Sequence, residues 1–152
     1  MALTPVLAPF DIQVDSSEIA VRDALAQVLI GLGPLDLDIE EAGTVELVLA
    51  EALNNIVEHA YGPDDHTGTI KIGCYHQSNG IHLRIEDDGV MMPEGKLPLG
   101  RAQDLEGDMM DLPEGGFGWF LIQDLAKDVC YERVGDSNRL DLRLAIALGD
   151  AD

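Results

Sequence analysis

The stretch EALNNIVEHAYG, from Glu51 to Gly62, lies in a long run of residues with helical spacing. Within it, Glu51, Asn55 and His59 recur at every fourth position. At about 100° per residue, a step of four turns a helix by only about 40°, so the three side chains form one nearly axial row. The row borders an apolar face made of Val45, Leu49, Ala52, Leu53, Ile56 and Ala60. A carboxylate, an amide and an imidazole at this border fit either an ordinary polar flank or a binding site.

The residues around this helix predict a small sheet and two further helices. Strands are expected at residues 10–14, 69–75, 81–86, 129–133 and 139–148. The first helix follows Asp15-Ser-Ser-Glu18, where Asp15 has the position of an N-cap with Glu18 three residues later. The second begins between Asp38 and Thr44 and runs to about Ala60, and a short one covers residues 119–127.

Two hairpins join these strands. Asn79-Gly80 is typical of a tight turn in which both φ angles are positive, and Gly135-Asp136-Ser137-Asn138 predicts the closing turn. The helices cluster apart from a mostly antiparallel, mixed sheet, so the fold class is α+β, a two-layer sandwich with helices on one face. Residues 1–152 are expected to form a single domain.

Composition limits the classes of function. The 152 residues carry a formal net charge of −20 with only nine Lys and Arg, which argues against direct nucleic-acid binding. No apolar run reaches the roughly 18 residues of a membrane span, and the N-terminus lacks a basic region of the kind that begins a secretory signal. A cytoplasmic protein without a membrane segment is therefore expected. Cys74 and Cys130 show no metal-type spacing and are expected to be reduced, buried thiols.

Two further motifs carry chemistry. In IEDDGV, from Ile85 to Val90, Asp87 ends a strand and Gly89 lets another group approach the backbone. A plain Asp-Gly turn is the alternative. In EGGFGWFLI, from Glu114 to Ile122, three glycines precede a helix, whose free N–H groups can hold phosphate oxygens. A flexible hinge into the helix is the alternative there.

In combination, these motifs resemble the GHKL ATPases, the family of gyrase, the chaperone Hsp90, histidine kinases and MutL. The chain is most similar to the small anti-sigma-factor serine/threonine kinases of bacterial partner switching. EALNNIVEHAY resembles their N-box, GGFGWFLIQDLAKDVCYER their second glycine box with the following helix and strand, and SNRLDLRL their last strand. The resemblance covers nearly the whole chain and implies the Bergerat ATP-binding fold.

The resemblance also implies roles for single residues. Asn55 would coordinate Mg²⁺ on the nucleotide phosphates, and Glu51 would be the general base toward a target hydroxyl. Asp87 would bind the adenine amino group, with Gly89 letting the ring lie against the backbone. The phosphates would be wrapped by Gly115, Gly116, Phe117 and Gly118.

Three parts of the chain lie outside these roles or depart from the pattern. Residues 90–114 would form the ATP lid. Val90-Met91-Met92 stand where the family has a second Gly or a Phe-Asp pair, and the flexible methionines are suited to line the adenine pocket. His59 is expected to support the site or to pack in the core.

The first interpretation of function is an ATP- and Mg²⁺-dependent protein serine/threonine kinase. It would phosphorylate a STAS-domain antagonist and sequester a sigma factor or another regulatory target. The alternative is a nucleotide-binding module that sequesters its partner without phosphotransfer. The catalytic half of a histidine kinase and an α+β domain without nucleotide are further alternatives. Members of the family commonly pair, so a homodimer is also expected.

Overall fold

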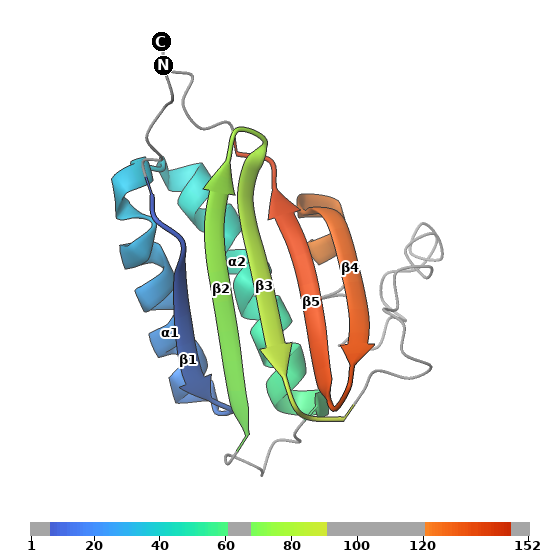
Figure 1. Cartoon of the computed structure of the whole chain (residues 1–152). Helices are drawn as coiled ribbons and strands as arrows, with labels where there is room; N and C mark the ends of the chain where they lie inside the picture. The colour runs from blue at the N-terminus through green and yellow to red at the C-terminus, as the bar shows by residue number, and fades with distance from the viewer. Residues whose placement is uncertain (1–6, 61–67, 91–120, 147–152) are drawn as a thin grey trace, which may run out of the picture.

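The computed structural model describes residues 7–60, 68–90 and 121–146. Their five strands form one sheet in the order β1-β2-β3-β5-β4, and every neighbouring pair is antiparallel. The strands are β1 (Phe10–Asp15), β2 (Thr69–Gln77), β3 (Gly80–Asp87), β4 (Lys127–Val134) and β5 (Ser137–Leu144). Helices α1 (Glu18–Gly31) and α2 (Ile39–Asn55) lie side by side behind the same face of the sheet (Figure 1). The predicted two-layer α+β sandwich is confirmed, although the described strands form no mixed sheet.

The two long helices begin at side-chain caps. Asp38 Oδ1 accepts a 2.8 Å hydrogen bond from the Glu41 N–H, and Glu41 Oε1 accepts a 2.9 Å bond from the Asp38 N–H. This reciprocal capping box places the start of α2 within the predicted interval. For α1 the predicted cap was wrong, because Ser17 accepts the bond from the Ala20 N–H at 3.0 Å. Asp15 is instead the last residue of β1, where it pairs with Thr69.

The core lies between the sheet and the two helices. All members of the apolar face predicted for α2 are buried, and Val48 joins them. The inward positions of the central strands alternate as the sequence pattern predicts, and they pack against that face. They are Ile70, Ile72 and Cys74 in β2, Ile81, Leu83 and Ile85 in β3, and Leu140, Leu142 and Leu144 in β5.

The β2–β3 hairpin exists as predicted, but its turn is one residue earlier. Gln77 pairs with Gly80, so Ser78 and Asn79 are the turn residues, and neither has a positive φ. Gly80 has φ 135°, and a Cβ there would collide with the carbonyl oxygen of Leu144 in β5. The glycine is therefore needed where the hairpin begins its second strand, and not inside the turn.

One end of the sheet gathers three segments that are far apart in the sequence. The π-helical turn η2 (Ile56–Ala60) continues α2, β3 ends at Asp87, and β4 and β5 are joined by a tight turn. All three lie at the lower end of the molecule in Figure 1. The strand order produces this meeting, because β5 returns to pair with β3 after β4 has occupied the sheet edge. None of the described helices is long and apolar enough to cross a membrane.

Candidate functional site

Glu51 and Asn55 lie one turn apart at the end of α2. Asn55 is buried, with 5% of its surface exposed, and Glu51 is half-buried. Asn55 Nδ2 donates a 2.8 Å hydrogen bond to the backbone carbonyl of Glu51. Asn55 Oδ1 is buried and has no hydrogen-bond partner among the described residues. A buried amide oxygen without a donor costs free energy on the order of 1–3 kcal/mol, so it points to a ligand.

A hard cation fits this oxygen. Mg²⁺ prefers oxygen ligands and often takes only one or two from the protein, with water and nucleotide phosphates supplying the rest. Among the described residues, no group of three or more His, Cys, Asp or Glu could hold a metal ion by itself. A magnesium ion at Asn55 would therefore take most of its other ligands from water and from phosphate oxygens. The amide oxygen of Asn55 is thus a donor that suits a metal–nucleotide complex.

Asp87 provides the second buried polar group, at the end of β3. It is 6% exposed, and its Oδ1 accepts bonds from the Gly89 N–H at 2.9 Å and from Asn138 Nδ2 at 2.8 Å. Burial raises the pKa of the Asp87 carboxyl above its ordinary value, while these two hydrogen bonds work in the opposite direction. The nearby charge of Asp88 raises this pKa further, and that of Arg133 lowers it. A partly desolvated carboxylate of this kind can accept a hydrogen bond strongly from a ligand amino group.

Gly89 joins the turn after β3 to the end of the helix. A Cβ on Gly89 would collide with the backbone carbonyl of Ala60, the last residue of η2. The next residue, Val90, donates its N–H to the same Ala60 carbonyl at 2.7 Å. In the structure the glycine therefore permits contact between two backbone segments. Its predicted contact with an adenine ring stays a prediction.

Three residues of the β4–β5 hairpin complete this region, and the sequence did not identify them. Asn138 is 3% exposed and contacts Asp87, Gly89 and Val90. The residue pattern placed it in the closing turn, whereas the family resemblance included it in the last strand, and the structure agrees with the latter. Tyr131 and Arg133 both donate to its Oδ1. One signal could have revealed Asn138, because it shares the two-residue period of Leu140, Leu142 and Leu144.

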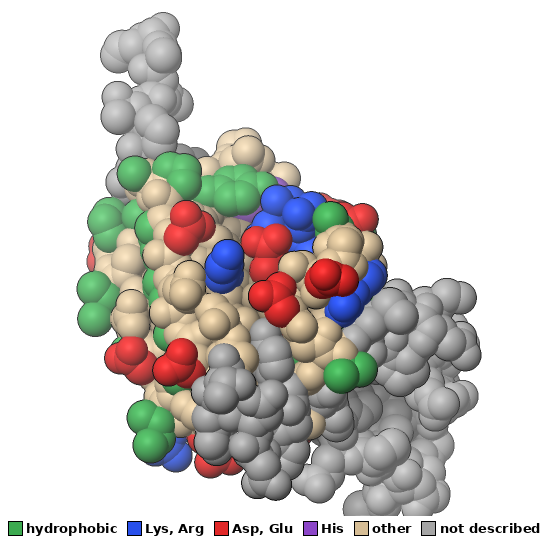
Figure 2. Space-filling view, turned by 60° about the horizontal axis from the view of Figure 1, so that its bottom comes forward, with side chains coloured by type: hydrophobic (Ala, Val, Ile, Leu, Met, Phe, Trp, Pro, Cys, Tyr) green, Lys and Arg blue, Asp and Glu red, His purple; other side chains and the backbone are tan. Residues whose placement is uncertain are grey.

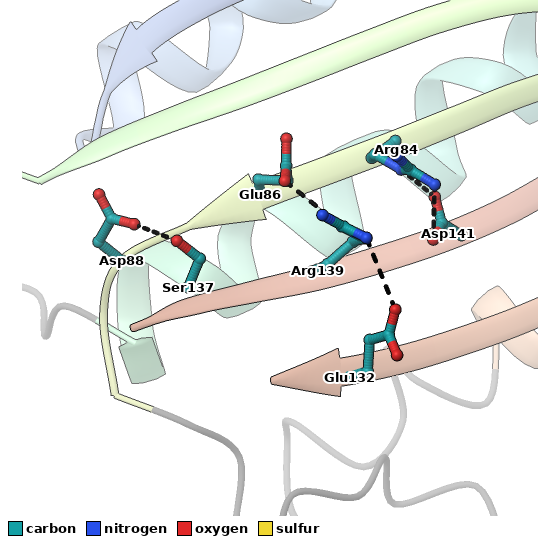
Figure 3. Close-up of polar contacts among 7 residues, drawn as sticks. All are labelled: Arg84, Glu86, Asp88, Glu132, Ser137, Arg139 and Asp141. Atoms are coloured by element: carbon teal, nitrogen blue, oxygen red, sulfur yellow. Dashed lines mark hydrogen bonds and ion pairs between the residues drawn. The ribbon is translucent and has the colours of Figure 1, made fainter. Parts of the chain in front are cut away.

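Polar side chains on the other face of the sheet also connect β3 with the hairpin (Figure 3). Ser137 Oγ donates to Asp88 Oδ1 at 2.7 Å. Farther along, Arg139 lies between Glu86 and Glu132, at 3.4 and 3.7 Å. Arg84 pairs with Asp141 at 2.7 Å and Arg143 with Asp128 at 2.8 Å. Acidic and basic side chains are accordingly intermixed on the surface in Figure 2. Such exposed pairs each contribute about 0–1 kcal/mol, so they align the strands more than they stabilise the fold.

Several predicted site residues lie outside the described residues. These are Gly115, Gly116, Phe117 and Gly118, together with nearly all of the predicted lid over residues 90–114. For His59 the backbone in η2 is described but the side chain is not. The structure thus brings the end of α2 and the Asp87–Gly89 turn to one end of the sheet. The phosphate-binding role of the glycine-rich segment remains a prediction.

The chain belongs to the histidine kinase-like ATPase domain family, whose model matches residues 15–144. The match includes all the predicted site residues. Together with the relatives below, it confirms the resemblance to GHKL ATPases and to their anti-sigma-factor serine kinases.

Among curated proteins, the chain is similar to the serine-protein kinase RsbW of Bacillus thuringiensis, with 31% identity over 110 residues. RsbW of Bacillus cereus strain AH820 is 32% identical over 111 residues. Each match covers 72% of this chain and 66% of the relative, so the chain spans just under two thirds of these kinases.

Solved structures support the fold. The crystal structure of the RsbU and RsbW domains of a Mycobacterium tuberculosis protein matches 90% of this chain and 32% of that chain, with a TM-score of 0.61 and 18% identity. The histidine kinase domain of a blue-light activated histidine kinase from Erythrobacter litoralis covers 82% of this chain and 60% of that one, with a TM-score of 0.50 and 19% identity. At these identities the likeness concerns the fold alone.

Proposed function

We propose that this chain binds ATP with Mg²⁺ and phosphorylates a serine or threonine of a protein partner. Family membership makes ATP the expected nucleotide, and the RsbW relatives carry the name serine-protein kinase. The observation that carries the proposal is the buried Asn55 Oδ1, which has no partner among the described residues and lies one helical turn after Glu51. A metal–nucleotide complex would supply what this oxygen lacks.

The proposed roles follow from where the side chains lie. Asn55 Oδ1 would hold the magnesium ion, which when bound neutralises phosphate charge and orients the γ-phosphate. Asp87 would accept the hydrogen bond of the adenine amino group. Glu51, four residues before Asn55 on the same side of α2, would take the proton of the incoming hydroxyl. The hydroxyl oxygen then forms a bond to the γ-phosphorus while the bond to the ADP oxygen breaks.

The partner we propose is a STAS-domain antagonist, with a sigma factor or another regulatory protein as the sequestered target. The similarity to RsbW proteins supports this assignment, and the net charge of −20 favours partners with basic surfaces. The glycine-rich segment Gly115–Gly118 would contact the phosphates. A homodimer in the cytoplasm remains part of the proposal.

The test is a transfer assay with γ-labelled ATP, Mg²⁺ and a STAS-domain protein encoded beside this chain. Wild-type protein should label the partner, and Glu51→Gln should reduce the rate at least about 100-fold while ATP still binds. Glu46→Gln is the matched control, because Glu46 is an exposed glutamate on the same helix. A stable complex that binds ATP without any transfer would contradict the kinase and favour a sequestering module.

A further inference from the structure

Asn138 is a buried polar residue whose role is not explained by the fold alone. It is the first inward-facing residue of β5, and the inward positions that follow it are leucines. Its Nδ2 donates to Asp87 Oδ1 at 2.8 Å and lies 3.2 Å from the carbonyl oxygens of both Gly89 and Val90. One amide therefore contacts Asp87, Gly89 and Val90 together. An apolar residue at this position would remove one donor from each of these three acceptors.

The orientation of the Asn138 amide is fixed from the neighbouring strand. Tyr131 Oη donates to Asn138 Oδ1 at 2.8 Å, and Arg133 Nη1 donates to the same oxygen at 2.9 Å. Arg133 Nη1 also donates to the Gly89 carbonyl at 2.8 Å. Because both donors approach the oxygen, the NH₂ group must face Asp87. The β4 strand thus determines that Asp87 meets a hydrogen-bond donor.

The two carboxylate oxygens of Asp87 differ in their hydrogen-bond partners. Oδ1 already accepts from Asn138 and from the Gly89 N–H. Within the part of the chain that the structure describes, no hydrogen bond reaches Oδ2 from another residue. Donors favour the ionised carboxylate, which opposes the effect of burial on its pKa. Oδ2 is therefore the oxygen that remains for a ligand donor.

We propose that Asn138 is a positioning residue that keeps Asp87 a hydrogen-bond acceptor and thereby selects purines with an amino group at position 6. The inference rests on the proposed nucleotide-binding function and extends it from Asp87 to the β4–β5 hairpin. A purine with an oxygen at position 6 presents an acceptor to the acceptor Oδ2. Discrimination against it then depends on the orientation and ionisation of Asp87, to which Asn138 contributes one of the two hydrogen bonds on Oδ1.

The experiment compares the affinities of ATP and inosine triphosphate, which has an oxygen in place of the 6-amino group, by calorimetry with Mg²⁺. Wild-type protein should prefer ATP by about tenfold or more, as expected for a hydrogen bond to a charged acceptor. Asn138→Leu should lower the ATP affinity and leave that for inosine triphosphate nearly unchanged, so that the ratio falls to about threefold or less. A purely structural role would lower both affinities in parallel.

A milder variant keeps the affinity comparison informative if Asn138→Leu does not fold. Tyr131→Phe removes one of the two donors to Asn138 Oδ1 and should reduce the ratio by about two- to threefold. Ser137→Ala is the matched control, because Ser137 belongs to the same hairpin but bonds to Asp88, and the ratio should not change. If Asn138→Leu folds and its ratio of ATP to inosine triphosphate affinity is unchanged, the role of Asn138 is overturned while the proposal of ATP binding stands. If Asn138→Leu does not fold, an unchanged ratio in Tyr131→Phe has the same meaning. A folded wild-type protein that binds neither nucleotide overturns both proposals.

Discussion

The amide of Asn55 donates to the carbonyl oxygen of Glu51 at 2.8 Å, and this bond turns its own oxygen away from every described donor. The residue thus combines a fixed orientation with an unsatisfied acceptor. In a helix whose other buried residues are apolar, such an arrangement lowers the stability of the empty protein. A ligand that coordinates this oxygen would compensate that cost.

Replacing Asn55 should weaken the binding of Mg²⁺ and ATP without greatly lowering the stability of the nucleotide-free protein. Asn55→Leu removes the unsatisfied oxygen together with one hydrogen bond, so the free energy of unfolding without nucleotide should stay within about 1 kcal/mol or rise. The gain in melting temperature on adding Mg²⁺ and ATP should disappear. Asn54→Ala, at the exposed neighbouring position, should keep that gain. If folded Asn55→Leu shows the same gain in melting temperature as the wild type, Asn55 does not take part in binding Mg²⁺ and ATP.

Asp87 should show a distinctive pH dependence. Because burial raises its pKa in the folded state, its contribution to the free energy of unfolding falls as pH rises from the ordinary aspartate pKa, about 3.9, to the folded value. Asp87→Asn removes this cost but keeps an Oδ1 acceptor for Asn138 and Gly89. In urea unfolding, the free energy of unfolding of Asp87→Asn should therefore increase relative to that of the wild type as pH rises through this window.

The same variant should bind ATP at least about tenfold more weakly, since an amide NH₂ replaces the acceptor Oδ2. Wild-type affinity should also fall as Asp87 takes up a proton, at a higher pH than for an ordinary aspartate. Asp11→Asn, an exposed position in β1, provides the control and should change neither property. A pH-independent stability difference for Asp87→Asn would contradict the assignment.

Gly89 should tolerate no side chain. Gly89→Ala forces a Cβ against the backbone of Ala60, which cannot rotate away as a side chain would, and should cost about 1–3 kcal/mol of stability. Gly43→Ala is the matched comparison, because nothing lies within 4 Å of its added Cβ in α2. That change should stabilise the protein by about 0.5–1 kcal/mol. Equal melting temperatures for the two variants would show that the contact with Ala60 is not restrictive.

The two cysteines should differ in reactivity. Burial raises the pKa of the Cys74 thiol to about 12, which suppresses the thiolate, whereas Cys130 is exposed on β4. The expectation of two buried thiols was therefore wrong for Cys130. Maleimide labelling under native conditions should modify one cysteine and mass spectrometry should locate it at Cys130, with Cys74 reacting only in denaturant. Labelling of Cys74 at a comparable native rate would contradict its placement in the core.

Periodicity predicted the layers of this fold because each element buries one face. The apolar stripe of α2 and the alternating strands β2 and β3 have that property, and their boundaries were placed within a few residues. The sequence was less decisive about the helix cap of α1, because two nearby residues could both serve as the N-cap. Asp15 and Ser17 both suit a helix cap, and the pairing of Asp15 with Thr69 decided between them.

The site was predicted only in part, for a related reason. The sequence signals of Glu51, Asn55 and Asp87 lie within short motifs, whereas the contact of Asn138 with Asp87 joins positions that are 51 residues apart. Asn favours turns, so the residue pattern placed Asn138 in the closing turn, and only the family resemblance included it in the last strand. The π-helical turn after Asn55 has no comparable signature in the sequence, since it is a local change of hydrogen bonding.

Calorimetric titration of ATP into the folded protein, with Mg²⁺ and again with excess EDTA, tests the central claim most directly. We predict saturable binding of one ATP per chain with Mg²⁺, and at least about tenfold weaker binding when the metal is removed or when Asn55 is replaced by leucine. Absence of any binding by the folded wild-type protein in the presence of Mg²⁺ would contradict the account.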